Sequence, residues 1–374
     1  MSSPHVLVMP GPAQGHVIPL LEFSQCLAKH GFRVTFVNTD YYHKRVVESL
    51  QGKNYLEEQI RLVSIPDGME PWEDRNDFGK LIEKFLQVMP RKLEELIEEI
   101  NSREDEKIDC FIADGNMGWS LEVAKKMNVR GGVFWSSSAA SVALVFRIPK
   151  LIDDGIIDSH GTPMSMQMFL IAPNMPEMNS RDCFWAHIGD LTTQKIFFDL
   201  LDRNTRAMRA VNFHFCNSTY ELESEAFTMF PELLPIGPLT ASNRQGNSAG
   251  YFWREDSNCL KWLDQQQPSS VIYAAFGSLT ILDQVQFQEF VDARFWLRLP
   301  TTRMSARSTS PRSGSLLFTP VILPTLGCGC PIVVIVGKWR WTLCLDSRIG
   351  RHVLPTAVDR VSSLRPLAGM TLCL

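Results

Sequence analysis

The amino-terminal stretch 5–39 constrains the fold more than any other part of the chain. It begins with an apolar run of strand length at 6–9, continues through a loop rich in Pro and Gly, and ends with a second apolar run at 34–37. Between the two runs, Pro19 suits the first turn of a helix and Gly31 suits its end. A strand, a helix and a strand in this order predict two parallel strands in one sheet.

His16 lies where the loop of this unit meets the helix. In parallel sheets, ligands bind beyond the carboxyl ends of the strands, and this loop belongs there. A histidine at that place can act as a base near neutral pH, or it can be a solvated loop residue, and this stretch alone leaves both readings open. The loop contains Gly11 and Gly15 but not the G-x-G-x-x-G pattern, so it does not predict a dinucleotide site.

A second unit of the same design occupies residues 109–135. A buried strand at 109–114 ends in Asp114, and a short polar loop, a helix and the next strand follow. If both units belong to one parallel sheet, Asp114 and His16 emerge at the same edge. There the carboxylate could hold the imidazole in one tautomer and stabilise its charged form, as the acid of a catalytic triad does, or it could simply cap a helix.

Three serines at 136–138 follow the next strand at that edge. Their hydroxyls suit a phosphate or a sugar, and they suit equally well the capping of a helix at 139–147. A further strand is predicted at 61–65, and helices are predicted at 76–102 and 191–211. The alternation of strands and helices predicts an α/β domain with a doubly wound parallel sheet.

Composition limits the class of protein. The chain has 374 residues, enough for two domains, and its content of 45% apolar and 21% charged residues describes a soluble globular protein. A net charge of −4 gives no reason to expect nucleic acid. Nine cysteines without a C-x-x-C pair predict free thiols in a reducing compartment. No basic region followed by an apolar core opens the sequence, so we expect no signal peptide and a cytoplasmic location.

The pattern predicts a division into domains. Residues 1–240 form the first α/β domain, and the polar, glycine-bearing stretch 241–258 reads as a linker. A new strand, a glycine turn and the start of a helix within 259–290 open a second α/β domain. Backbone N–H groups and hydroxyls at 277–280 could meet a phosphate at the end of that helix.

The character of the sequence changes after residue 290. Residues 291–374 contain ten Arg, one Lys, three Asp and no Glu, a net charge of +8, whereas the whole chain carries −4, so the first 290 residues carry −12. Residues 313–337 lack charge over a length that could span a bilayer, but three prolines interrupt them, so we expect no membrane anchor.

Five segments resemble the plant UDP-sugar-dependent glycosyltransferases that act on small molecules, and they occur in the order of that family. They are PGPAQGHVIPLLEFSQCLAKHG, FIADGNMGWSLEVAKKMNV, CNSTYELESEA, LPIGPL and CLKWLDQQQPSSVIYAAFGSLT, within about residues 5–290. The resemblance implies the GT-B fold, in which two doubly wound α/β domains face each other across a cleft. The amino half then binds the acceptor and the carboxyl half binds the nucleotide sugar.

The resemblance also implies roles for individual residues. His16 matches the catalytic base and Asp114 its partner acid, so His16 would take the proton of an acceptor hydroxyl while UDP leaves the inverted anomeric carbon, without a metal or other cofactor. The residues matched to donor binding are Gly15, Ser136, Ser278 and Thr280. The residues matched to acceptor binding are Gln14, Asn116, Met117 and Val145. The expected partners are a UDP-sugar, UDP-glucose first, and a small apolar acceptor such as a phenolic or terpenoid alcohol, bound by a monomer.

The tail departs from the family. The family's second domain carries a signature with Trp-Ala-Pro-Gln and His-Cys-Gly-Trp-Asn-Ser elements and a closing Asp-Gln pair, which together hold the donor. None of these elements occurs after Phe290. We therefore interpret residues 291–374 as an atypical tail, out of frame or mis-spliced rather than a divergent domain. Two hypotheses follow, a UDP-glycosyltransferase and a truncated, inactive remnant that at most binds acceptor, and we expect no detectable transfer by the 374 residues.

Overall fold

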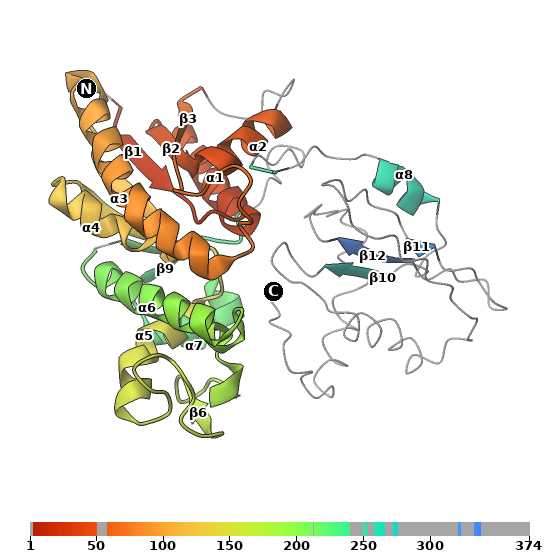
Figure 1. Cartoon of the computed structure of the whole chain (residues 1–374). Helices are drawn as coiled ribbons and strands as arrows, with labels where there is room; N and C mark the ends of the chain where they lie inside the picture. The colour runs from red at the N-terminus through yellow and green to blue at the C-terminus, as the bar shows by residue number, and fades with distance from the viewer. Residues whose placement is uncertain are drawn as a thin grey trace. The chain divides into compact units, whose positions relative to one another are not determined.

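The computed structural model of the chain describes eight stretches. They are residues 3–50, 58–211, 213–239, 250–252, 258–265, 272–275, 321–322 and 333–337. Contacts between residues divide the chain into two units, and Figure 1 labels most of their helices and several of their strands. The described residues up to 252 belong to the first unit, and those from 258 onward belong to the second.

A parallel sheet of seven strands forms the centre of the first unit, in the order β3-β2-β1-β4-β5-β8-β9. The strands are β1 His5–Met9, β2 Arg33–Thr39, β3 Ile60–Ile65, β4 Cys110–Asp114, β5 Arg130–Trp135, β8 Phe213–Cys216 and β9 Leu233–Pro235. The chain winds from β1 outward to β3 and then continues from β4 in the other direction. The switch between β1 and β4 is the point where doubly wound sheets bind ligands.

Helices cover both faces of this sheet (Figure 1). They are α1 Gln14–Lys29, α2 Asp40–Leu50, α3 Phe78–Asn101, α4 Ser120–Lys126, α5 Ala139–Asp153, α6 Leu191–Met208 and α7 Tyr220–Met229. A hairpin and four short 3-10 turns complete the unit: β6 Met168–Leu170, β7 Glu177–Asn179, η1 Glu104–Glu106, η2 Gly115–Met117, η3 Ser180–Asp182 and η4 Phe184–His187.

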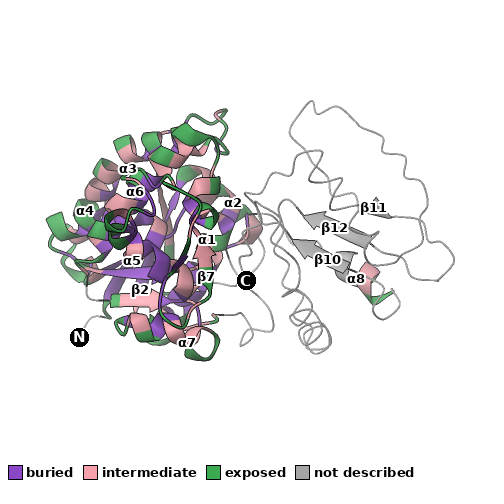
Figure 2. Cartoon of the chain, turned by 90° about the horizontal axis from the view of Figure 1, so that it is seen from below, coloured by how far each residue is buried: buried purple, intermediate pink, exposed green. Residues whose placement is uncertain are grey.

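Side chains of β1 alternate between two apolar cores. Leu7 and Met9 pack in the core shared with α3 to α7, whereas Val6 and Val8 pack in the core shared with α1 and α2. All four are almost completely buried, as Figure 2 shows for the interior of this unit in general. A strand buried on both faces is typical of parallel sheets between two helix layers, so the predicted doubly wound α/β fold is confirmed.

Helix α1 begins earlier than the sequence predicts. It starts at Gln14, so Pro19 lies inside the helix, and the prediction that Pro19 occupies the first turn is wrong. Pro19 has no N–H to donate to the carbonyl one turn earlier, which costs one helical bond. Val17, in the part of the helix before Pro19, is completely buried in the core, and such tertiary packing supplies most of the stability of helices in proteins.

The other predicted elements lie close to the observed ones. Strands predicted at 61–65 and 109–114 and helices predicted at 76–102 and 191–211 match β3, β4, α3 and α6 within three residues at either end. Helix α5 continues six residues past the predicted 139–147. Among the described residues, no helix is both long and apolar enough to cross a bilayer.

The second unit is described in four short elements. They are α8 Asn258–Asp264, β10 Ile272–Ala275, β11 Val321–Ile322 and β12 Val333–Gly337. Strand β12 pairs in parallel with β10 and antiparallel with β11. Most of residues 291–374, including the greater part of the uncharged run at 313–337, lies outside the described residues.

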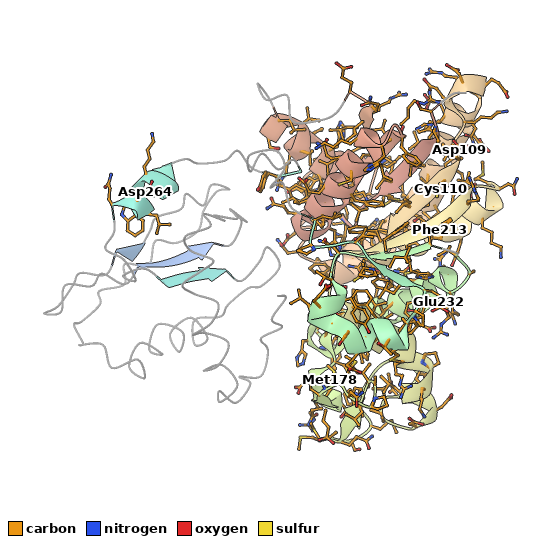
Figure 3. The ribbon with its side chains drawn as sticks, turned by 180° about the vertical axis from the view of Figure 1, so that it is seen from behind. Asp109, Cys110, Met178, Phe213, Glu232 and Asp264 are labelled. Carbon is orange, nitrogen blue, oxygen red and sulfur yellow. The ribbon has the colours of Figure 1, made fainter. Side chains whose placement is uncertain are left out.

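The amino end of β1 is tied to its neighbours by His5. Its backbone N–H donates to Asp109, labelled in Figure 3, at 2.8 Å. The ring nitrogens lie 2.6 Å from the Glu106 carbonyl oxygen and 2.8 Å from the Thr35 hydroxyl, and burial lowers the pKa of His5. These bonds fix β1 against β2 and the start of β4, and hence the register in which both strands reach the opposite edge.

A buried ion pair organises the loop between β3 and α3. Arg75 and Asp67 form two bonds, Nε to Oδ2 at 2.9 Å and Nη2 to Oδ1 at 3.1 Å, with both side chains at least 94% buried. The guanidinium also donates to three carbonyl groups of the loop and lies over the ring of Tyr41. The loop is therefore folded around the Arg75 guanidinium, whose N–H groups donate to Asp67 and to carbonyl groups of the loop.

Replacing this cation should be costly. We expect Arg75→Ala to lower the free energy of unfolding by about 3–5 kcal/mol, because it leaves the Asp67 carboxylate buried without its partner. The matched control is Arg91→Ala, which removes a pair with Glu95 on the exposed face of α3 and should cost about 0–1 kcal/mol. Urea unfolding followed by circular dichroism measures both, and equal costs for the two variants would contradict the prediction.

Candidate active site

The structure brings His16 and Asp114 together at the carboxyl edge of the sheet. His16 lies in the first turn of α1, directly after the loop that follows β1, and Asp114 is the last residue of β4. Because β1 and β4 are parallel neighbours, their ends meet, and His16 Nδ1 lies 2.8 Å from Asp114 Oδ2. The Asp114 side chain is 1% exposed and the His16 side chain is 24% exposed, so the carboxylate is buried and part of the imidazole is accessible to solvent.

Asp114 serves in both of the ways that the sequence allows. Its Oδ1 accepts the backbone N–H of Asn116 at 2.9 Å and caps the turn η2, while its Oδ2 faces His16. The cap fixes the carboxylate plane, so that the second oxygen is directed at the imidazole. Capping and pairing are therefore two parts of one arrangement rather than alternatives.

The neighbours of the imidazole determine its tautomer. An ionised carboxylate only accepts hydrogen bonds, so Nδ1, which faces Asp114, bears the proton and Nε2 keeps its lone pair. The Ser136 hydroxyl lies 2.8 Å from the same Nδ1 and 3.4 Å from Asp114 Oδ2. The side-chain nitrogen of Asn116 lies 3.3 Å from Nε2. This arrangement presents Nε2 as the basic atom of the site.

Two opposing effects set the pKa of His16. Burial lowers it, and the charge of Asp114 together with the hydrogen bond from Nδ1 raises it by more, so that the pKa of His16 lies above its ordinary value of 6.5. The imidazole is therefore a stronger base than a free histidine. A reaction that needs its neutral form should become faster as the pH rises through that pKa.

A close approach of the loop after β1 depends on Gly11. A Cβ atom at this position would lie 3.2 Å from His16 Cγ and 3.3 Å from Asp114 Oδ1, tighter than most real contacts. A side chain at 11 would thus press on both members of the pair. Gly15 differs, because a Cβ there would meet no described atom within 4 Å, and its assignment to donor binding stays a prediction.

Of the two roles that the sequence leaves open for the serines after β5, the structure shows helix capping, and the assignment of Ser136 to donor binding stays a prediction. Ser136 contacts His16, as described above, and Ser138 caps α5 by accepting the backbone N–H of Ser141 at 3.2 Å. The first two N–H groups of α5, those of Ala139 and Ala140, donate to the carboxylate of Glu223, at 2.9 and 3.0 Å. The sequence analysis missed Glu223, which lies in the segment CNSTYELESEA but has no local signal for a bond to a helix about 80 residues earlier.

The residues matched to acceptor binding differ in their surroundings. Of the four, Asn116 is hydrogen-bonded to both members of the His16–Asp114 pair. Gln14 is buried and its Oε1 accepts the backbone N–H of Phe252 at 2.9 Å, while Met117 and Val145 are buried in the core that α3 to α7 share. Their roles in acceptor binding stay predictions. Ser278 and Thr280, matched to donor binding, lie outside the described residues.

Comparison with known proteins places this geometry in context. No family model matches the chain. It is 44% identical over 298 residues to UDP-glycosyltransferase 83A1 of Arabidopsis thaliana, covering 77% of this chain and 64% of that protein. It is 28% identical over 309 residues to the 7-deoxyloganetin glucosyltransferase of Catharanthus roseus, covering 77% and 63%. The chain thus spans less than two thirds of the length of these relatives.

Solved structures share the fold. One is a UDP-glucosyltransferase from Polygonum tinctorium capable of glucosylating indoxyl, with a TM-score of 0.61, 22% identity, and coverage of 79% of this chain and 64% of that chain. Another is Os79 from O. sativa in complex with UDP, with a TM-score of 0.58, 20% identity, and coverage of 77% and 65%.

The tautomer and the pKa of His16 can be tested directly. We expect Asp114→Asn to lower the pKa of His16 below that of an ordinary histidine, because the charge that raises the pKa is lost while the burial that lowers it remains. Nuclear magnetic resonance of the full chain labelled with [15N]histidine measures the titration, with the His16 signal identified by its loss in His16→Gln.

The control for this prediction is Asp199→Asn. Asp199 faces His160 at 3.7 Å on the exposed surface of the same unit, so its removal should leave the His16 titration unchanged. A pKa of His16 that does not fall in Asp114→Asn would contradict the electrostatic role of the acid.

Proposed function

Because this chain belongs to the plant UDP-glycosyltransferases, we propose that its first unit supplies the acceptor site and the general base for moving glucose from UDP-glucose to a hydroxyl of a small apolar acceptor. The doubly wound sheet is the amino-terminal domain of the GT-B fold, which the sequence predicts. The observation that supports the base is the His16–Asp114 pair at the switch point, in which His16 Nδ1 lies 2.8 Å from Asp114 Oδ2.

The proposed reaction transfers one proton, forms one bond and breaks one bond. The acceptor hydroxyl gives its proton to His16 Nε2, and its oxygen forms the new bond to the anomeric carbon of the sugar. The bond between that carbon and the diphosphate breaks on the opposite face, the electron pair leaves with UDP, and the configuration inverts. Asp114 stabilises the imidazolium that forms, because its charge lies 2.8 Å from Nδ1.

A second candidate function rests on the sequence after Phe290. The donor-binding signature of the family is absent from residues 291–374. A chain with an intact first unit but without those donor contacts would bind the acceptor and transfer nothing, because positioning of the two substrates supplies much of the rate of such a reaction. This candidate is an acceptor-binding remnant, and it differs from the first candidate only in what the second half of the chain does.

A chimera tests the role of His16 independently of residues 291–374. We expect residues 1–252 joined to the corresponding second half of the 44% identical Arabidopsis relative to glucosylate phenolic or terpenoid alcohols from UDP-glucose. His16→Ala in this chimera should lower kcat/KM by about 10²–10⁴-fold, because the hydroxyl loses its base. The control is His160→Ala, an exposed histidine of the same unit, which should leave kcat/KM unchanged. Mass spectrometry of the products measures the rates, and an active chimera that tolerates His16→Ala would overturn the proposal.

The unmodified chain distinguishes the two candidates. We expect the 374-residue protein to bind apolar alcohols in calorimetric titrations and to give no product with UDP-glucose. Turnover by the unmodified chain would reject the remnant and support the transferase.

A further inference from the structure

Asn116 contacts both members of the His16–Asp114 pair. Its backbone N–H donates to Asp114 Oδ1 at 2.9 Å, and its side-chain nitrogen lies 3.3 Å from His16 Nε2. Nε2 is the atom that takes the proton in the proposed reaction. The same residue therefore orients the acid through its backbone and meets the base through its side chain.

The direction of the side-chain bond follows from the tautomer. Since Nδ1 bears the proton, Nε2 has a lone pair, and the Asn116 amide donates to it. A donor on this nitrogen stabilises the neutral imidazole and opposes the effect of Asp114, which stabilises the charged form. At 3.3 Å the bond is longer than an ordinary N–H bond to an acceptor, so an incoming hydroxyl group can displace it.

Helix α6 holds Asn116 in place through Asn204. Asn204 is 1% exposed, its Nδ2 donates to the Asn116 carbonyl at 2.8 Å, and its Oδ1 accepts the backbone N–H of Trp119 at 2.8 Å. The buried side chain of Asn204 thus bonds to the carbonyl group of Asn116 and to the N–H group of Trp119, which lie on either side of Gly118. A Cβ atom at 118 would lie 2.9 Å from the Asn204 backbone, so a glycine there permits the close approach.

Asp114 and Ser136 lie at the other nitrogen of the imidazole, Nδ1, whereas Asn116 lies at Nε2. Asp114 from β4 is the charged group that acts on His16 among the described residues, and it lies at Nδ1. Ser136, after β5, also lies at Nδ1, and Gly11 contributes no side chain. In the described part of the chain, the Asn116 amide is the hydrogen-bond partner of Nε2, so a change in this side chain acts on the base and leaves the bond between Asp114 and Nδ1 in place.

We propose that Asn116, held by Asn204, is a positioning residue for the base. In the resting site its amide donates to Nε2 and keeps the neutral imidazole in the orientation that presents this nitrogen to the acceptor. The acceptor hydroxyl then replaces the amide as the donor and passes its proton to Nε2. This inference rests on the proposed role of His16 as the base, and it adds the residues that keep that base neutral and aligned.

The test follows the titration of His16 in the full chain labelled with [15N]histidine. We expect Asn116→Ala to move the titration midpoint of His16 upward, because the neutral form loses its donor. Asn116→Asp should move it further upward, because a second carboxylate stabilises the imidazolium. Asn204→Ala should move it in the same direction by less than Asn116→Ala, because Asn116 remains present but is no longer fixed.

The matched control lies next to Asn204 on the same helix. Thr205 is buried and its hydroxyl donates to the Leu201 carbonyl within α6, so Thr205→Ala should leave the His16 titration unchanged. A purely structural role of Asn116 would lower the unfolding midpoint and leave the His16 titration at its original value, and this result would overturn the inference. If the alanine variant does not fold, Asn116→Asp decides, because it keeps the size of the side chain and both backbone bonds.

The outcome can be separated from that of the proposed function. The titration of His16 needs no turnover, so it can be measured in the full chain even if the chimera is inactive. A chimera that depends on His16 together with an unchanged titration in Asn116→Asp would reject the positioning role and keep the base.

Discussion

The pairing of β1 with β4 is the constraint on which the site depends. These two strands are adjacent in the sheet but about 100 residues apart in the chain, and the register joins Met9 to Ala113. One residue beyond that pair, Asp114 ends β4, and the loop after β1 returns His16 to within 2.8 Å of it. Because a shift of one residue would turn Asp114 to the other face of the sheet, the bonds of His5 at the far end of β1 contribute to the geometry of the site.

Three glycines allow the backbone near the His16–Asp114 pair to pack closely against neighbouring residues. Gly11 allows the first loop to lie against the imidazole, Gly115 lies under the ring of Trp135, and Gly118 lies against Asn204. At each of these glycines, a Cβ atom would lie 3.2 Å or less from a residue of a different element. The site is thus held by contacts among β1, β4, β5 and α6, and its geometry depends on the packing of the whole first unit.

The sequence predicts the parts of this arrangement that follow from local pattern. Two repeats of strand, loop and helix place His16 and Asp114 at one edge, because parallel strands end together. It does not predict Asn204, since one asparagine in an amphipathic helix has no signature of its bond to Asn116. The bond between Gln14 and Phe252 joins residues 238 positions apart, and the placement of Pro19 inside α1 reflects tertiary packing, so neither follows from local propensity.

In the described structure, the surroundings of the His16 imidazole are formed by the first unit. All groups that set the proton affinity of His16 in the described structure come from the first unit: Asp114, Ser136, Asn116 and, through it, Asn204. None of these contacts involves a residue after Phe252. The proton affinity of His16 is therefore set within one unit, whereas the proposed transfer also requires a bound donor. A chain with this first unit but without donor contacts would retain an imidazole with a raised pKa and a defined tautomer, and it would differ from an active relative in failing to position the donor.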